Sequence, residues 1–316
     1  MSNSHDFPSR DFPIPWKVNL RDYESVDKYL NSLVAEGVSL PVFLAQSSKS
    51  NNCLASLIGR IRELLTDKDG GVALVDLGHT LKGKPELVDR AKLLIIALGE
   101  NFGRTVTRNH LSDSPFFPVY QRKEGKGPNY VGNALSNNQP GLHTDGSAWR
   151  VARVDLLALL AIQQAFIGGD TIVVNALHVF QTLPADVQTF LCNREFIRQD
   201  PFDPDHPDPV RRTVYDHVEG NFYSGLAIRY HRSRIDGGHQ VKNEPLTRED
   251  IYLLNTFEMV LNRQLFRLQF RLKSGQILLL NNNIICHDRT SFKDLGRRRR
   301  YLERYWAGQP YQQSHS

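Results

Sequence analysis

The pattern of apolar and polar positions divides the chain into a helical first third and a strand-rich remainder. Apolar residues recur at three- and four-residue spacing over 22–36, 51–65 and 85–98, which predicts three amphipathic helices. The apolar run 72–77 follows two glycines and predicts a short buried strand between the second and third helices. Residues 1–16 carry three prolines and are predicted to form a flexible N-terminal arm.

From about residue 105 onward, short apolar segments bounded by turn residues predict a series of strands. They cover 155–162, 171–174, 210–218, 221–230, 266–272, 276–282 and, in partial alternation, 297–306. Helices are predicted at 184–193 and at 247–262, where Thr247 and Asp250 have the spacing of a capping box.

The order of these elements decides the fold class. Strands and helices do not alternate regularly, which disfavours a doubly wound parallel sheet. We expect a mainly β protein with helices (α+β), in which a jelly roll is buttressed by the N-terminal helices. Residues 17–316 are expected to form one domain.

Composition excludes several classes of protein. Of 316 residues, 40% are hydrophobic and 23% are charged, which is typical of a globular chain. No run approaches the roughly 18 apolar residues of a membrane span, and the N-terminus lacks a basic start followed by an apolar core. Three cysteines are too few and too scattered for a disulfide framework or a thiolate zinc site. We expect a cytoplasmic protein without a membrane partner.

The net charge of +5 is concentrated in the run Arg297–Arg300. Such a run is typical of a solvated face or a nucleic-acid patch. Because acidic residues are interspersed throughout the chain, we expect no nucleic-acid partner.

Candidate chemistry lies at His143-Thr144-Asp145. On an extended strand, side chains two residues apart point to the same face, so this imidazole and carboxylate can share one metal ion. One further histidine would complete a two-histidine, one-carboxylate set, which leaves open positions on iron. A second pair of this spacing, His206 and Asp208, lies among four prolines in 201–209 and is typical of a surface turn.

The context of the first pair carries a resemblance. The motifs are HTD (143–145), GGDT (168–171), NNNIICHDRTSF (281–292) and RRYLERYW (299–306). In this order, over about 71–307, the chain resembles the taurine dioxygenase / clavaminate synthase-like superfamily of iron(II)- and 2-oxoglutarate-dependent oxygenases. The resemblance implies a double-stranded β-helix and iron ligation by His143, Asp145 and His287. The family often has glycine directly after the distal histidine, whereas this chain has Asp288.

The resemblance also implies a site for 2-oxoglutarate. Thr171 and Arg300 match the residues that bind its distal carboxylate, with Arg298 and Arg304 as alternatives within the arginine-rich segment. If that segment is a strand, Arg298, Arg300 and Arg304 share one face. Asp145 is present where radical halogenases have a small residue, so hydroxylation is the expected reaction.

The implied reaction consumes O₂ and 2-oxoglutarate, releases succinate and CO₂, and hydroxylates a C–H bond of a small polar metabolite. An amino-acid-like or carboxylate-bearing substrate is expected, and the oligomeric state is left open. Candidate substrate contacts are Asn133, Ser147, Trp149, Arg229 and Arg304. Desaturation, epimerisation or cyclisation could use the same residues, and a non-catalytic jelly-roll binding protein is the alternative from another class.

Overall fold

The computed structural model describes residues 17–35, 51–67, 69–107, 114–121, 136–150, 152–200 and 208–310. Within these ranges the main sheet has seven strands, and all of its neighbouring pairs are antiparallel except the parallel pair at one edge. In spatial order they are β1 (Lys17–Asn19), β2 (Val72–Asp76), β13 (Gln276–Asn281), β5 (Ala152–Gln163), β16 (Tyr301–Pro310) and β3 (Arg104–Thr105), with β4 (Phe116–Tyr120) also paired to β16. The predicted strand at 276–282 is therefore central, which explains why every residue of β13 is buried.

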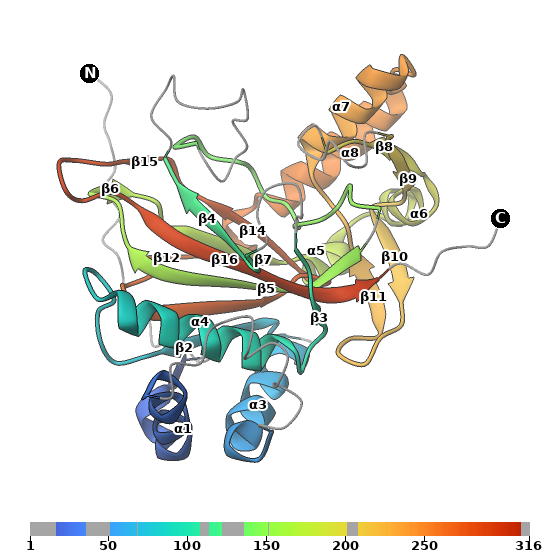
Figure 1. Ribbon diagram of the computed structural model, residues 1–316. Coiled ribbons are helices and arrows are strands. Elements are labelled where there is room, and N and C mark those ends of the chain that lie inside the picture. The colour runs from blue at the N-terminus through green and yellow to red at the C-terminus, as the bar shows by residue number, and fades with distance from the viewer. Residues whose placement is uncertain are drawn as a thin grey trace.

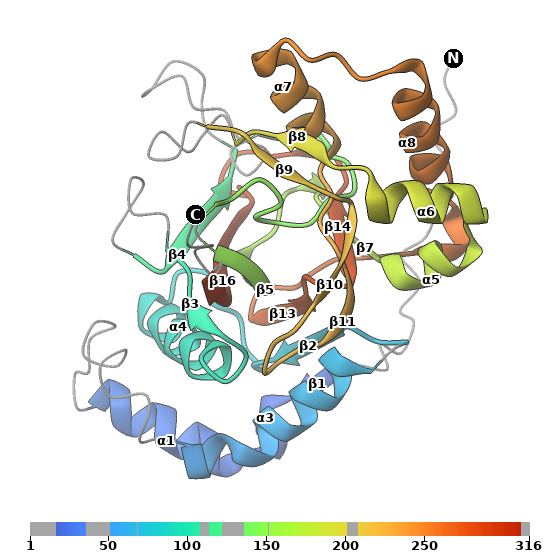
Figure 2. The ribbon, with the colours of Figure 1, turned by 90° about the vertical axis from the view of Figure 1, so that its right-hand side faces the viewer.

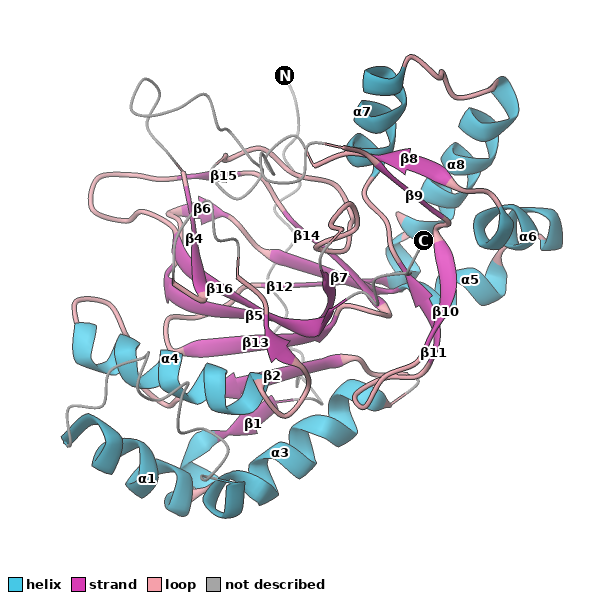
Figure 3. Cartoon of the chain, turned by 45° about the vertical axis from the view of Figure 1, so that its right-hand side comes forward, coloured by secondary structure: helices cyan, strands magenta, loops and turns pink. Residues whose placement is uncertain are grey.

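A second sheet packs against the main one and completes the jelly roll (Figures 1 and 3). Its strands are β12 (Arg267–Phe270), β7 (Thr171–Asn175) and β14 (Ile285–Arg289), in that order. Val173 of β7 shares an apolar core with residues of the main sheet such as Leu157, Leu278 and Trp306. Its neighbour Ile172 points the opposite way, into a different core. The two sheets thus enclose one layer of side chains.

The N-terminal helices cover the outer face of the main sheet, below it in Figure 1. They are α1 (Glu24–Ala35), α3 (Asn51–Thr66) and α4 (Pro85–Gly99), as the apolar spacing predicts. A short 3₁₀ turn, η1 (Leu20–Asp22), precedes α1, and the predicted arm 1–16 lies outside the described residues.

A second group of helices lies on the other side of the molecule, as Figure 2 shows. It contains α5 (Ala176–Thr182), α6 (Ala185–Asn193), α7 (Arg232–Lys242) and α8 (Arg248–Leu261), with the 3₁₀ turn η4 (Gln264–Phe266) after α8. The hairpins β8 (Phe196–Arg198)–β9 (Val210–Arg212) and β10 (Tyr215–Val218)–β11 (Gly225–Ile228) accompany them. The predicted capping box is present, because Thr247 and Asp250 each accept the other's backbone amide at 3.0 Å.

Several boundaries differ from the sequence prediction. The segment 210–218 forms two strands rather than one, and α5 and α7 were not predicted. The arginine run is not part of a strand: Leu295 and Arg298 pair across a turn that contains Gly296, and β16 begins only at Tyr301. That turn follows β15 (Phe292–Lys293), which pairs with β6 (Ile167–Gly168). Within the described ranges, no helix is both long and apolar enough to cross a bilayer.

Candidate metal centre

Three side chains of the jelly roll converge on one point. His143 forms a single antiparallel bridge with His287, the middle residue of β14, and the two rings lie 4.4 Å apart. Asp145 Oδ1 lies 3.6 Å from His143 Nε2 and 4.0 Å from His287 Nε2. One potential ligand atom from each residue lies within 4.8 Å of the others, which is the spacing that a single metal ion can bridge. The structure therefore brings together the three residues that the sequence motifs indicated.

Asn282 of the NNN motif binds the backbone of Asp145 and so holds this residue in place. Asn282 is fully buried; its Oδ1 accepts the Asp145 amide and its Nδ2 donates to the Asp145 carbonyl, both at 3.0 Å. Asn282 Nδ2 also donates to Val154 O at 2.8 Å, which ties the ligand loop to β5. Asn282 lies directly after β13, so the central strand of the main sheet positions Asp145.

The protonation states of Asp145 and His287 favour the binding of a metal cation. Burial alone would raise the pKa of Asp145, but the Arg304 guanidinium and the neighbouring imidazoles hold it well below its usual range. Burial, and then the adjacent His143, lowers the pKa of His287 to about 3. Metal ions bind carboxylates and neutral imidazoles, so these two ligands are already in the form that binding requires. This donor set fits iron(II).

A hydrogen-bonded arginine and tryptophan flank the carboxylate ligand. Arg304 Nη1 lies 3.1 Å and Trp306 Nε1 2.8 Å from Asp145 Oδ2, both from β16. The Arg304 guanidinium also stacks on the Trp306 ring at 4.4 Å. Its Nε is buried without a hydrogen-bond partner among the described residues. A cation is thus held beside the metal centre.

Arg300 is the buried member of the arginine run. Arg297, Arg298 and Arg299 are exposed, whereas the Arg300 side chain is only 3% accessible. Its Nε and Nη1 have no hydrogen-bond partner in the described part of the chain. Burial, and then the nearby Arg289, lowers the pKa of Arg300 to about 9. A buried guanidinium whose nitrogen atoms lack partners is suited to binding an anion.

The surroundings of Arg300 include the GGDT motif. A Cβ on Gly169 would lie 3.1 Å from Arg300 Cδ, so the glycine leaves room for the arginine. Thr171 is buried on β7, directly opposite Arg289 of β14. Because paired residues share a face, Thr171 and Arg289 lie on the same side of the sheet as His287. Thr171, Arg289 and the candidate ligand His287 therefore share one face of the smaller sheet.

The other candidates from the sequence occupy different surroundings. Arg229 is buried and donates to Asn283 Oδ1 at 2.6 Å, so it supports the NNN turn. Trp149 donates to Asp200 Oδ2 at 3.0 Å and packs edge-on against Trp306, while the Ser147 carbonyl accepts a bond from Arg198. Asn133 and His206 lie outside the described residues.

A third histidine lies beside the ligands and was not anticipated. The ring of His231 lies 4.7 Å from that of His143, and burial followed by His143 lowers its pKa well below the usual range. It directly precedes α7, whose position the sequence pattern did not reveal. Only the fold brings His231 to this place.

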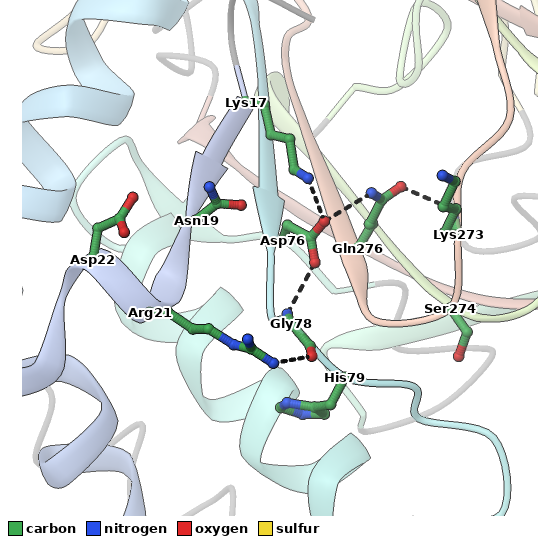
Figure 4. Close-up of a pocket in the computed structure, with 10 residues that line it drawn as sticks. All are labelled: Lys17, Asn19, Arg21, Asp22, Asp76, Gly78, His79, Lys273, Ser274 and Gln276. Carbon is green, nitrogen blue, oxygen red and sulfur yellow. Dashed lines mark hydrogen bonds and ion pairs between the residues drawn. The ribbon is translucent and has the colours of Figure 1, made fainter. Parts of the chain in front are cut away.

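A pocket of about 530 Å³ lies away from the metal centre, between β1, β2 and the turn before β13 (Figure 4). Asp76 occupies its middle, where it pairs with Lys17 at 2.8 Å and Gln276 at 3.1 Å. Gln276 is the first residue of β13, whereas the metal centre lies beyond the last, Asn281. These paired side chains fasten the edge of the sheet.

Two imidazoles and a carboxylate on a jelly roll form the donor set that mononuclear non-haem iron oxygenases use. The comparisons with known proteins identify the family. Residues 87–306 match the family described as taurine catabolism dioxygenase TauD, TfdA family. The chain belongs to this family of iron(II)- and 2-oxoglutarate-dependent dioxygenases, as the motifs indicated.

Individual relatives are more distant. FR-33289 synthase of Streptomyces rubellomurinus is 26% identical over 223 residues, which cover 68% of this chain and 62% of that protein. Asparagine oxygenase, solved with Fe(II), 3-hydroxyasparagine and succinate, has a TM-score of 0.69 at 15% identity, with 93% of each chain covered. The oxygenase OrfP, solved with Fe, succinate and (3S)-hydroxy-L-Arg, has a TM-score of 0.64 at 15% identity over 93% of this chain and 94% of its own. These structures share the fold.

Proposed function

We propose that this protein hydroxylates an unactivated C–H bond of a small polar metabolite that is amino-acid-like or carries a carboxylate. The observation that carries this proposal is the convergence of His143, Asp145 and His287 on one point, where one potential ligand atom from each lies within 4.8 Å of the others. Bound iron(II), with 2-oxoglutarate, supplies the activation of O₂, and succinate and CO₂ are released. The molecules bound to the structural relatives support the amino-acid class, because asparagine oxygenase was solved with 3-hydroxyasparagine and OrfP with (3S)-hydroxy-L-Arg.

In this proposal Arg300 and Thr171 bind the distal carboxylate of 2-oxoglutarate. A guanidinium offers two parallel N–H groups to a carboxylate, and Arg300 has buried nitrogen atoms without partners in the described residues. Arg298 is exposed and stacks near Phe166, at 5.8 Å, so we retain it only as the weaker alternative.

Arg304 is proposed to orient an acidic group of the substrate. It lies on β16 beside the carboxylate ligand, and its Nε has no partner among the described residues. Ser147 and Trp149 are close in sequence to Asp145 and remain candidate contacts, together with Asn133. Arg229 would act indirectly, through Asn283.

An anaerobic titration with Fe(II) and 2-oxoglutarate, followed by O₂ and a succinate assay over small acids and amino acids, tests this function. The product mass distinguishes these reactions. Hydroxylation adds one oxygen atom, desaturation removes two hydrogen atoms, and epimerisation leaves the mass unchanged. His143→Ala, Asp145→Ala and His287→Ala should abolish succinate release, whereas His206→Ala and Asp208→Ala should retain it. Metal binding without turnover of any substrate would favour the non-catalytic binding protein.

A further inference from the structure

Within the described residues 136–145, the segment that leads into the metal centre pairs with β14 at one rung. The His143 amide donates to His287 O at 3.1 Å, and the His287 amide donates to His143 O at 2.9 Å. In a regular antiparallel ladder, the next rung of this kind would join Gly141 and Arg289. Neither backbone amide of that rung makes the expected bond, because both are bound by one side chain.

That side chain is Asp288, which is buried. Its Oδ1 accepts the Gly141 amide at 3.1 Å and the Arg289 amide at 2.8 Å. Its Oδ2 accepts a bond from Gln139 Nε2 at 2.5 Å. The carboxylate therefore takes the place of the missing rung and caps the ladder beside the iron ligands.

Capping leaves the Gly141 carbonyl available to a different donor. His143 Nδ1 lies 2.8 Å from Gly141 O, and because a carbonyl can only accept, Nδ1 carries the proton. The lone pair then resides on Nε2, the atom that faces Asp145. Gly141 adopts a φ of +85°, a conformation open to glycine, which turns the peptide away from the strand path.

We propose that Asp288 is a positioning residue for the iron ligand His143. By accepting the two amides, it keeps the Gly141 carbonyl on His143 Nδ1 and so fixes both the tautomer and the ring orientation. Such outer contacts typically change metal affinity 10- to 100-fold. This role rests on the proposed metal-dependent function.

The test is the affinity of the metal-free protein for Co(II) alone, read from its visible absorption under anaerobic conditions. Asp288→Ala should weaken Co(II) binding by about 10- to 100-fold. Gln139→Ala is the matched control: it removes the other contact of the same carboxylate and should leave the affinity near the wild-type value. Asp288→Asn should retain most of the affinity, because an amide oxygen still accepts both backbone N–H groups.

A second readout reports on the hydrogen bond itself. In the Co(II) protein, the paramagnetically shifted NMR signal of the His143 Nδ1 proton should be lost to solvent exchange in Asp288→Ala and persist in Gln139→Ala. Thermal unfolding of each metal-free variant shows whether that variant folds. If Asp288→Ala does not fold, the test rests on the Co(II) affinity of Asp288→Asn.

Three results would overturn the positioning role: unchanged affinity in Asp288→Ala, an equal loss in Gln139→Ala, or a full loss in a stably folded Asp288→Asn. Failure of the wild-type protein to bind Co(II) would instead refute the proposed function, so the two failures are distinguishable.

Discussion

At the scale of single residues, Arg300 differs most sharply from its neighbours. It is buried and lacks partners for two nitrogen atoms among the described residues, while Arg298 is exposed. If Arg300 binds 2-oxoglutarate, Arg300→Ala should raise the apparent 2-oxoglutarate constant about 10- to 150-fold, because charge-assisted bonds contribute roughly 1.5–3 kcal/mol. Arg300→Lys should recover little, because lysine lacks the planar fork. Steady-state succinate assays check this, and an equal effect of Arg298→Ala would contradict the assignment.

The same residue predicts an effect on stability. A buried charge without a partner destabilises the protein, so Arg300→Leu should leave the 2-oxoglutarate-free protein as stable as the wild type or about 1 kcal/mol more stable. Wild type at 100 times the dissociation constant of 2-oxoglutarate should gain about 2.7 kcal/mol. If the variant binds 10- to 150-fold more weakly, it should gain only about 0.3–1.4 kcal/mol at the same concentration. Thermal unfolding at a fixed metal concentration, with and without 2-oxoglutarate, measures both. A variant that 2-oxoglutarate stabilises as much as the wild type would show that the anion binds elsewhere.

The ligands themselves were accessible from the sequence because local spacing and motif order place them. His143 and Asp145 are two residues apart, and His287 ends an apolar run. The residues that orient them were not: Asn282 reaches Asp145 and Asp288 reaches Gly141 across more than a hundred positions. A single sequence contains no signal for such distant pairing.

At the scale of elements, the sequence predicted helices and strands correctly where apolar residues recur at a regular spacing. It failed where contacts with distant parts of the chain determine the local structure. α3 and α4 have continuous apolar faces, and β13 is a continuous apolar run. α7 contains Gly237 and Gly238, which disfavour a helix on propensity alone. Its packing against β8 overrides that propensity. Likewise, the turn at Gly296 removed the strand alternation expected for Arg298 and Arg300.

The paired glycines of α7 give a prediction with an internal control. A Cβ on Gly237 would meet no atom within 4 Å, whereas one on Gly238 would collide with the backbone carbonyl of Ile197 in β8. Gly237→Ala should therefore raise the free energy of unfolding by about 0.5–1 kcal/mol. Gly238→Ala should lower it by about 1–3 kcal/mol, because the strand or the helix must shift. Urea denaturation of the two variants tests this, and the same sign for both would show that α7 is not packed as described.

At the scale of the whole molecule, the metal centre lies between two cores. The helices α1, α3 and α4 stabilise the main sheet, and α5 to α8 pack behind the smaller sheet that carries His287. Burial on both sides is the main cause that keeps His287 and His231 neutral. The pKa of His287 is lowered to about 3, and that of His231 is lowered well below its usual value. Ligand protonation is thus coupled to the stability of the whole fold.

This coupling fixes the sign of the pH dependence of stability. Histidines with lowered pKa stay neutral in the folded state while the unfolded chain takes up protons below about pH 6.5, so their contribution is full above that pH and is lost as the pH falls. Asp145, with a pKa below its usual value, has no effect on stability until the pH is lower still.

From pH 7 to pH 5, His287, with a pKa of about 3, should remove up to about 2 kcal/mol from the free energy of unfolding of the metal-free protein, and His231 should act in the same direction. Urea denaturation across this range should show His231→Asn parallel to wild type above pH 7 and less acid-sensitive than wild type between pH 6.5 and pH 5. Curves that stay parallel down to pH 5 would mean that His231 is protonated in the folded protein and is not buried beside His143.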